Sequence, residues 1–288
     1  MKAAPGLACG NSIIIKISEL NPFSTLFMVS LATQVGIPPG TLNCLIGGRD
    51  VGEALSSHMD IRKISFTGSI KAGKLIQVAA ANSNLKSVTL ELGGESPLIV
   101  FPNADLERAL QPATMFLLMN GQGCALPTRL AWPEHRRGPE SPEHFVVAAV
   151  SSAPERSCFV VHPDWNKEAT LLTGGKPIGA KGCYAEPTTF VDPHPDAKIL
   201  REEIFGPVLV IVRFSTEDEV IKLANDNEFG LAAYVWTADL SRALRLSQKL
   251  EAGAVSVNEA GGVQPNVPMG GWKQSGQGTE NGEEAMLD

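Results

Sequence analysis

Residues 63–94 read KISFTGSIKAGKLIQVAAANSNLKSVTLELGG, and the order of apolar and helix-forming stretches within them indicates the fold. Residues 63–66 have the composition of a short strand, residues 69–82 that of a helix, and residues 88–91 that of a second strand. Strands separated by helices of this length are typical of parallel β–α–β units. The stretch therefore predicts an α/β protein built on a parallel sheet.

The same alternation continues on both sides of this unit. We expect strands at 13–15, 42–46, 98–101, 208–214 and 254–257, and helices at 22–34, 51–58, 106–119, 217–225 and 241–250. The nearly continuous apolar strands indicate a sheet that is covered on both faces. Residues 132–156 are rich in Pro, Arg, Ser and Glu and predict a loop, and the polar residues 276–288 predict no closing strand.

Composition excludes several classes of function. The chain has 288 residues, 43% of them hydrophobic, which is enough for one large or two modest cores. A net charge of −7 argues against nucleic acid as a partner, and no basic cluster or apolar run of about 20 residues indicates a membrane. Five widely spaced cysteines favour a reducing, cytoplasmic setting, and the histidines show no HExxH pattern, so we expect no metal.

The glycine-rich corner between residues 68 and 75 is the first candidate ligand site. Gly68, Ser69 and Gly73 lie where a strand passes into a helix, so backbone N–H groups there are suited to bind a phosphate. The spacing nearly matches a P-loop, but Leu75 replaces the Ser or Thr whose hydroxyl would bind Mg²⁺. A nucleoside triphosphate site, a dinucleotide phosphate site and an ordinary tight corner remain open, and the motif alone favours the ordinary corner.

Two further candidates carry charge at the ends of predicted strands. Lys16 and Glu19 follow the first strand, where ligands of parallel sheets are expected, and they are suited to hold ribose hydroxyls. The alternative is a solvated charge pair. Glu91 ends another strand among apolar residues that would raise its pKa, which suits a general base. The alternative is an exposed carboxylate in a turn.

The last candidates are Cys124, after Gly121-Gln122-Gly123, and the pair Glu203 and Phe205. The glycines allow close backbone approach to a reactive thiol, although an isolated cysteine is more often a small buried apolar residue. Glu203 and Phe205 are suited to flank a nicotinamide and its ribose, and the alternative is a turn before a strand with a packed Phe.

Taken together, the order and spacing of these motifs are specific. The LELGG run at 90–94, the GQGC run at 121–124, the EEIFGPV run at 202–208, Asn258 and the PMGGWKQSG run at 268–276 occur in that order. The chain resembles the NAD(P)-dependent aldehyde dehydrogenase superfamily over residues 1 to about 130 and about 170 to 288. The resemblance implies a partial, Rossmann-like dinucleotide-binding domain at 1–95 and an α/β catalytic domain at 96–260 that is irregular at 131–157. It also implies a segment at 261–288 that returns toward the cofactor domain.

The resemblance also implies chemistry, namely oxidation of an aldehyde to a carboxylic acid. Cys124 resembles the nucleophile that forms a thiohemiacetal and then a thioester, and Glu91 resembles the base that activates water for hydrolysis. The cofactor contacts that it implies are Lys16, Glu19, Gly68, Ser69, Gly73, Leu92, Glu203 and Phe205. Glu19 would repel a 2′-phosphate, so we favour NAD over NADP.

The chain also departs from the family's pattern. Family members carry a long segment before the position of Lys16, with an Asn amide that completes the oxyanion hole, and a final strand that pairs across subunits. We expect both to be missing here, and losing one such donor costs about 3–4 kcal/mol. Glu95 stands where the family usually has Lys. Two hypotheses follow: a working aldehyde dehydrogenase of a normally homo-oligomeric family, or an impaired fragment from an incomplete reading frame, with residual dinucleotide binding.

Overall fold

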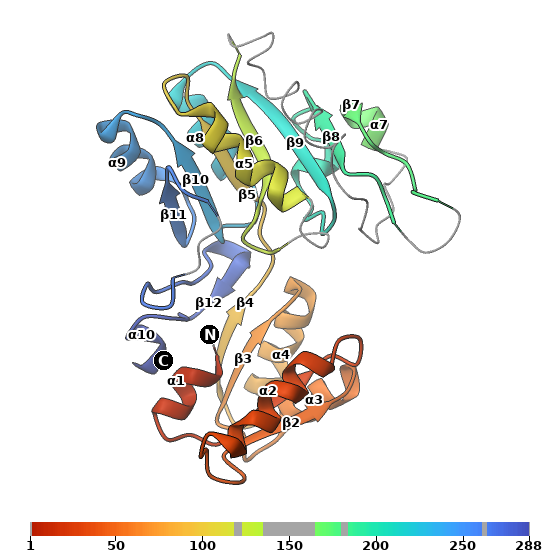
Figure 1. Cartoon of the computed structure of the whole chain (residues 1–288), viewed down its shortest axis with the longest axis vertical. Coiled ribbons are helices and arrows are strands. Elements are labelled where there is room, and N and C mark those ends of the chain that lie inside the picture. Colours follow the sequence, from red (N-terminus) through yellow and green to blue (C-terminus); the bar gives the residue numbers. More distant parts are fainter. Residues whose placement is uncertain (1, 118–122, 135–164, 180–183, 261–263, 288) are drawn as a thin grey trace. The chain divides into compact units, whose positions relative to one another are not determined.

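The computed structural model describes residues 2–117, 123–134, 165–179, 184–260 and 264–287, and it divides into two compact units (Figure 1). The first unit contains Met1–Glu91, Val263–Gly270 and Gln277–Asp288. The second unit contains Leu92–Gly262 and Gly271–Gly276. The dinucleotide-binding and catalytic roles assigned to these parts of the sequence stay predictions.

The first unit holds two small sheets, each with a parallel pair of strands. Its elements are α1 (Ala3–Ala8), β1 (Ile13–Ile17), α2 (Phe23–Gln34), β2 (Leu42–Ile46), α3 (Arg49–Ser57), β3 (Lys63–Thr67), α4 (Ile70–Asn82), β4 (Ser87–Glu91) and α10 (Glu284–Leu287). Strand β1 pairs with β2 and β3 pairs with β4, both in parallel, and the second sheet has the order β12-β4-β3, where β12 is Gly276–Gln277. The strand–helix–strand prediction for residues 63–91 is therefore confirmed.

The second unit is built on one seven-stranded sheet with the order β11-β10-β5-β6-β9-β8-β7. Its elements are β5 (Ser96–Val100), α5 (Leu106–Leu117), β6 (Pro127–Pro133), α7 (Trp165–Glu168), β7 (Thr170–Thr173), β8 (Thr188–Val191), β9 (Val208–Phe214), α8 (Glu217–Asn225), β10 (Ala232–Trp236), α9 (Leu240–Lys249) and β11 (Ala254–Val257). All neighbouring strands are parallel except the edge pair β7 and β8. The predicted α/β fold class is confirmed.

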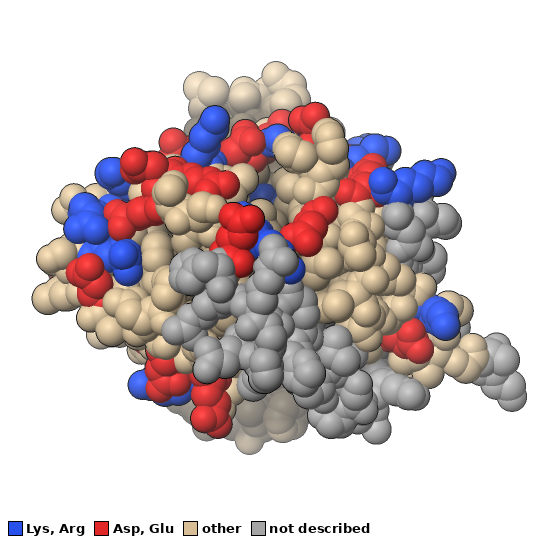
Figure 2. All heavy atoms as spheres, turned by 90° about the horizontal axis from the view of Figure 1, so that it is seen from above, with Lys and Arg blue, Asp and Glu red and all other residues tan. Residues whose placement is uncertain are grey.

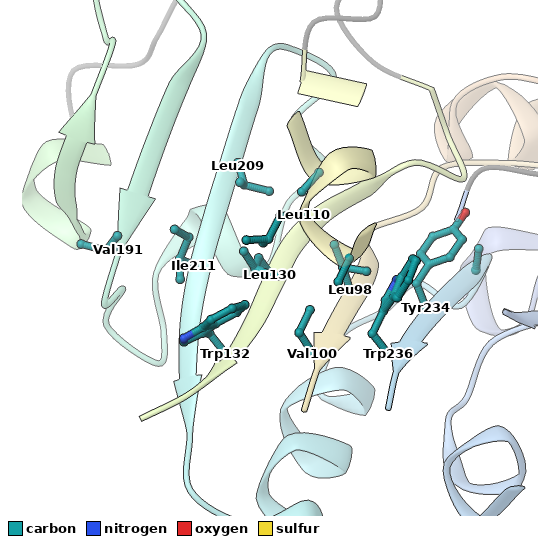
Figure 3. Packing of buried hydrophobic residues seen from close by; sticks show 13 residues of the cluster. Leu98, Val100, Leu110, Leu130, Trp132, Val191, Leu209, Ile211, Tyr234 and Trp236 are labelled. Carbon is teal, nitrogen blue, oxygen red and sulfur yellow. The ribbon is translucent and has the colours of Figure 1, made fainter. Parts of the chain in front are cut away.

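Alternating side chains of the central strands cover this sheet on both faces. On one face Leu98 and Leu130 pack with Leu110 of α5, in the cluster shown in Figure 3. On the other face Ile99 of β5 packs in one cluster with Val220 of α8 and with Leu246 of α9. Successive residues of a strand point to opposite faces, so burial of both sets explains the continuous apolar run of β5.

The loop prediction for residues 132–156 is wrong where the structure tests it. Trp132 and Pro133 belong to β6, which lies between β5 and β9, and Trp132 is fully buried. The prolines and charges that follow concealed the end of an apolar strand, and residues 135–164 lie outside the described residues. Strands β6, β7, β8 and β10 and helices α1 and α7 were not predicted. In the stretch 276–288, for which no closing strand was predicted, the structure has the two-residue strand β12, which pairs with β4, and helix α10.

Helix ends agree with local sequence signals. At the start of α8 the hydroxyl of Thr216 accepts a hydrogen bond from the N–H of Glu219, and the Glu219 carboxylate accepts one from the N–H of Thr216. This reciprocal pair is the capping box that the sequence indicated. Helix α9 begins in a related way, with the Asp239 carboxylate accepting from the N–H of Arg242.

Charged side chains of both signs are interspersed on the face shown in Figure 2. In the part of the chain that the structure describes, no helix combines the length and the apolar character needed to cross a membrane. Within the same residues no group of three or more His, Cys, Asp or Glu side chains is placed to hold a metal ion.

Candidate functional site

In the second unit, two glycines bring three separate segments together. The N–H of Gly94 donates a hydrogen bond to Oε1 of Glu203 at 3.0 Å. A β-carbon on Gly94 would collide with the carbonyl oxygen of Cys124, and one on Gly93 would collide with the Glu203 carboxylate. Glycine is required at Gly94 because a backbone carbonyl approaches it so closely, whereas a β-carbon on Gly93 would push the end of the Glu203 side chain out of its present position. The predicted nucleophile and one predicted cofactor contact are therefore neighbours of the same two-residue segment between β4 and β5.

Ser275 also holds this segment in place. Its side chain is fully buried, and its hydroxyl donates to the carbonyl of Gly93 at 2.6 Å and accepts from the N–H of Gly230 at 2.8 Å. The carbonyl of Ser275 accepts from the N–H of Leu92 at 2.8 Å. Buried polar groups that are satisfied in this way make a rigid support for neighbouring residues. Leu92, a predicted cofactor contact, is itself buried in this support.

Cys124 is half-buried in a tight turn directly before β6. The N–H of Leu126 donates to the carbonyl of Gly123 at 2.9 Å, which closes the turn. The hydroxyl of Tyr234, from β10, donates to the carbonyl of Ala125 at 2.5 Å. The turn is thus held by its own backbone and by a side chain from the central sheet, and this arrangement presents the cysteine on a fixed support.

Glu203 and Phe205 lie on the segment before β9, with Ile204 between them. Ile204 is buried in a core cluster, whereas the Phe205 ring is 57% exposed. This alternation turns the Phe205 ring toward solvent while Ile204 anchors the segment. Burial raises the pKa of Glu203, and the hydrogen bond from Gly94 acts in the opposite direction. An exposed aromatic ring beside a partly buried carboxylate is suited to contact a planar ring and a ribose.

Glu91 ends β4 in the first unit and is almost fully buried. Its Oε1 atom has no hydrogen-bond partner among the described residues. Burial raises the pKa of Glu91 to about 7, the nearby charge of Glu280 adds to the rise, and Lys2 opposes it. A carboxylate with a pKa near neutrality is suited to proton transfer. The expectation that apolar surroundings raise this pKa agrees with the structure.

The groups that act on Glu91 form a small cluster of their own. Lys2 forms an ion pair with Glu280, and the hydroxyl of Ser65 donates to the same carboxylate at 3.0 Å. Oε2 of Glu280 has no hydrogen-bond partner within the described segments. Sequence reasoning missed Lys2, Ser65 and Glu280, because they are distant from each other in the chain and match no local motif.

Lys16 and Glu19 lie at the carboxyl end of β1, and both are exposed. A β-carbon on Gly48, the residue that precedes α3, would lie 3.3 Å from Oε1 of Glu19. The carboxylate of Glu19 therefore lies against bare backbone at the amino end of a helix, next to the exposed end of the β1–β2 pair. An exposed carboxylate at such a strand end is suited to bind ribose hydroxyls.

The glycine-rich corner joins β3 to α4 as predicted. Ser69 is exposed and caps α4, because its hydroxyl accepts from the N–H of Ala72 at 3.3 Å. The N–H of Gly68 donates to the carbonyl of Glu91 at 3.1 Å, and Gly73 is buried in the helix. The corner therefore connects the predicted phosphate contacts to the strand that carries the predicted base, and the exposed amino end of α4 fits an anionic group.

Comparisons with known proteins agree with this arrangement of motifs. Residues 1–152 and 139–288 match the model of the aldehyde dehydrogenase family. The chain is 43% identical to retinal dehydrogenase 2 of Gallus gallus, over 100% of this chain and 59% of that relative. It is 41% identical to aldehyde dehydrogenase, cytosolic 1, of Rattus norvegicus, over 100% of this chain and 61% of that relative. The chain thus spans about 60% of the length of these curated relatives.

Solved structures give the same result for the fold. The crystal structure of gamma-glutamyl-gamma-aminobutyraldehyde dehydrogenase from Burkholderia cenocepacia superposes with a TM-score of 0.90 at 39% identity, over 99% of this chain and 62% of that chain. An indole-3-acetaldehyde dehydrogenase, solved in complex with NAD+, has a TM-score of 0.86 at 36% identity, over 99% of this chain and 62% of that chain.

Proposed function

Because the chain belongs to the aldehyde dehydrogenase family, we propose that it oxidises an aldehyde to a carboxylic acid with NAD+ through Cys124. The observation that carries the proposal is the meeting of the Cys124 turn and the Glu203 carboxylate at the Gly93–Gly94 backbone. This contact supports the proposal, because the candidate nucleophile and the candidate cofactor contact are then neighbours in the same compact unit.

In the proposed reaction, the thiolate of Cys124 attacks the aldehyde carbonyl carbon and forms a thiohemiacetal. The same carbon then gives up a hydride, for which NAD+ held by the residues named below would supply the acceptor. The resulting thioester remains attached to Cys124 until water, deprotonated by a base, attacks it, which releases the carboxylic acid and returns the thiolate. In sum, aldehyde, water and NAD+ give carboxylic acid, NADH and a proton.

Glu91 is proposed to take the proton from the attacking water. A pKa of about 7 leaves a large part of Glu91 ionised at neutral pH and still basic enough to accept a proton. Glu280 and Lys2 act on this pKa in opposite directions, so we propose that they adjust the base without touching the reacting atoms. The ion pair between them keeps both charges in place.

The residues proposed to hold the dinucleotide are those with exposed or anionic groups at strand and helix ends. Glu19 is proposed to bind the adenosine ribose hydroxyls with Lys16 beside it, and its negative charge favours NAD over NADP. The corner of Gly68, Ser69 and Gly73 is proposed to lie against the pyrophosphate. Glu203 and Phe205 are proposed to contact the nicotinamide ribose and ring, and Leu92 is proposed to belong to the same cofactor site. An NAD+ complex of a related structure is consistent with this choice of cofactor.

The test is an absorbance assay of NADH formation by the purified chain with a short aliphatic aldehyde. We expect aldehyde-dependent NADH that disappears in Cys124→Ser and persists in the control variant Cys9→Ser, which changes an exposed cysteine. NAD+ binding without turnover would instead support the impaired fragment. Binding of ATP with Mg²⁺ and not of NAD+ would support the nucleoside triphosphate site. Cytoplasmic location and homo-oligomeric assembly stay predictions.

A further inference from the structure

A buried ion pair lies directly beside the Gly93–Gly94 segment and has no part in the reaction proposed above. Glu95 follows Gly94, and Arg129 lies in β6, the strand next to β5. Oε2 of Glu95 is 2.5 Å from Nε of Arg129, and the two side chains are only 2% and 9% exposed. Burial raises the pKa of Glu95, and the charge of Arg129 opposes the rise.

Both members of this pair hold the same short segment of the chain. Oε1 of Glu95 accepts a hydrogen bond from the N–H of Ile204 at 3.2 Å. Arg129 donates from Nη2 to the carbonyl of Leu200 at 2.6 Å. With the bond from Gly94 to Glu203, three polar contacts fix residues 200–204 against the starts of β5 and β6.

A gain in stability does not by itself explain why this ion pair is buried. Removing two charges from water is costly, and apolar residues of similar volume are often as stabilising as a buried ion pair. A buried pair instead has the property of specifying one geometry, because each partner accepts only a few orientations of its neighbours. Here the neighbours are the backbone groups on either side of Glu203.

We propose that Glu95, together with Arg129, is a positioning residue that holds residues 200–204 so that Glu203 and Phe205 are in place for the dinucleotide. The role in dinucleotide binding rests on the proposed function, whereas the hold on the segment does not. Neither residue needs to touch the cofactor, because their contacts are to backbone groups of the segment that carries Glu203.

The decisive variant is Glu95→Met/Arg129→Met, which removes both charges together and leaves neither one buried without a partner. A single substitution would strand the other charge and endanger folding. Glu217→Gln is the matched control, since Glu217 forms ion pairs with Arg242 and Arg245 of α9 in the same unit. Cooperative thermal unfolding of each variant establishes that it is folded before the other measurements are compared.

The first measurement is hydrogen exchange of peptides that cover residues 198–206, followed by mass spectrometry. We expect faster exchange there in the double variant, with unchanged exchange in β9 and in the Glu217→Gln control. Unchanged exchange at residues 198–206 would overturn the claim that Glu95 and Arg129 hold residues 200–204 in place, whatever the ligand of this protein is.

The second measurement is a calorimetric titration with NAD+. We expect about tenfold weaker binding in the double variant, since the segment must be ordered when the ligand binds. The control should bind NAD+ like the unsubstituted chain. Faster exchange with unchanged NAD+ affinity would overturn the positioning role. If the unsubstituted chain did not bind NAD+, the proposed function would be overturned, and with it the role of Glu95 and Arg129 in dinucleotide binding. The exchange measurement would still decide whether this pair holds residues 200–204 in place.

Discussion

The backbone N–H of Gly94 donates a hydrogen bond to the carboxylate of Glu203, although the two residues lie 109 positions apart in the sequence. The same glycine lies against the carbonyl of Cys124. One residue without a side chain therefore connects the proposed nucleophile to the proposed cofactor contact. Its hydrogen atom in place of a β-carbon permits the close approach of the Cys124 carbonyl, while its backbone N–H makes the bond to Glu203.

Gly94→Ala is expected to separate these segments. The added β-carbon collides with the Cys124 carbonyl and lies 3.0 Å from Cβ of Leu231, so neighbouring backbone must move. Overpacking of this kind costs about 1–3 kcal/mol, and a displacement near 1 Å lowers the rate on the order of 10²-fold. Thermal unfolding and kcat for aldehyde oxidation measure the two effects.

The control for this substitution is Gly52→Ala in α3. A β-carbon on Gly52 meets nothing within 4 Å, so the change should stabilise the helix by about 0.5–1 kcal/mol and leave kcat unchanged. If Gly94→Ala retained the kcat of the unsubstituted chain, the close approach of Gly94 to Cys124 would have no importance for the reaction.

Tyr234→Phe tests the support of the Cys124 turn from the central sheet. The variant loses the hydrogen bond to the carbonyl of Ala125 and should lose about 1 kcal/mol of stability. We expect a several-fold lower kcat and an altered rate of Cys124 alkylation by iodoacetamide, followed by mass spectrometry. Tyr184→Phe removes a hydroxyl from a half-exposed ring and should change neither quantity. An alkylation rate equal to that of the unsubstituted chain would show that Tyr234 does not hold the turn.

The sequence predicted those parts of the molecule whose signals are local. The strand at 63–67, the corner at Gly68 and the capping box at Thr216 depend on residues within a few positions of each other, and the structure contains all three. Strand β6 was not predicted at all, because Trp132 and Pro133 adjoin a polar stretch and because the burial of the strand depends on its neighbours β5 and β9.

The surroundings of the candidate site depend on contacts that no local pattern encodes. Glu280 raises the pKa of Glu91 from 189 positions away in the chain, and Ser275 supports Gly93 from 182 positions away. Such contacts arise only when the fold is complete. The motif around each candidate residue was therefore predictable, whereas the groups that adjust its pKa or fix its position were not.

The pH dependence of the rate tests Glu91 as the base. With a pKa of about 7, activity should rise with pH through neutrality as the carboxyl group loses its proton. Glu280→Gln removes a charge that raises this pKa, so the midpoint should move to lower pH. Lys2→Met removes a charge that lowers it, so the midpoint should move to higher pH. A pH profile of kcat that is identical in all three proteins would exclude Glu91 as the titrating group.

The pH dependence of stability tests the same carboxylate without any substrate. The pKa of Glu91 is about 7 in the folded chain and near 4.5 in a solvated one, so the folded state binds its proton more tightly. Proton binding by Glu91 therefore adds to the free energy of unfolding. This stabilisation is fully present below pH 4.5 and is lost as the pH rises through 7. It amounts to at most about 3 kcal/mol. Glu91→Gln cannot titrate, so its free energy of unfolding should fall less than that of the unsubstituted chain between pH 5 and pH 8.

Denaturant unfolding at several pH values measures this difference. Glu53→Gln, which changes an exposed carboxylate paired with Arg49, is the control and should leave the pH dependence unchanged. Glu95 is also buried with a raised pKa, so the free energy of unfolding of Glu91→Gln should still fall to some extent as the pH rises. If the free energy of unfolding changed equally with pH in the unsubstituted chain and in Glu91→Gln, Glu91 would already be ionised in the folded state at low pH. In that case burial would not make it a base that works near neutrality.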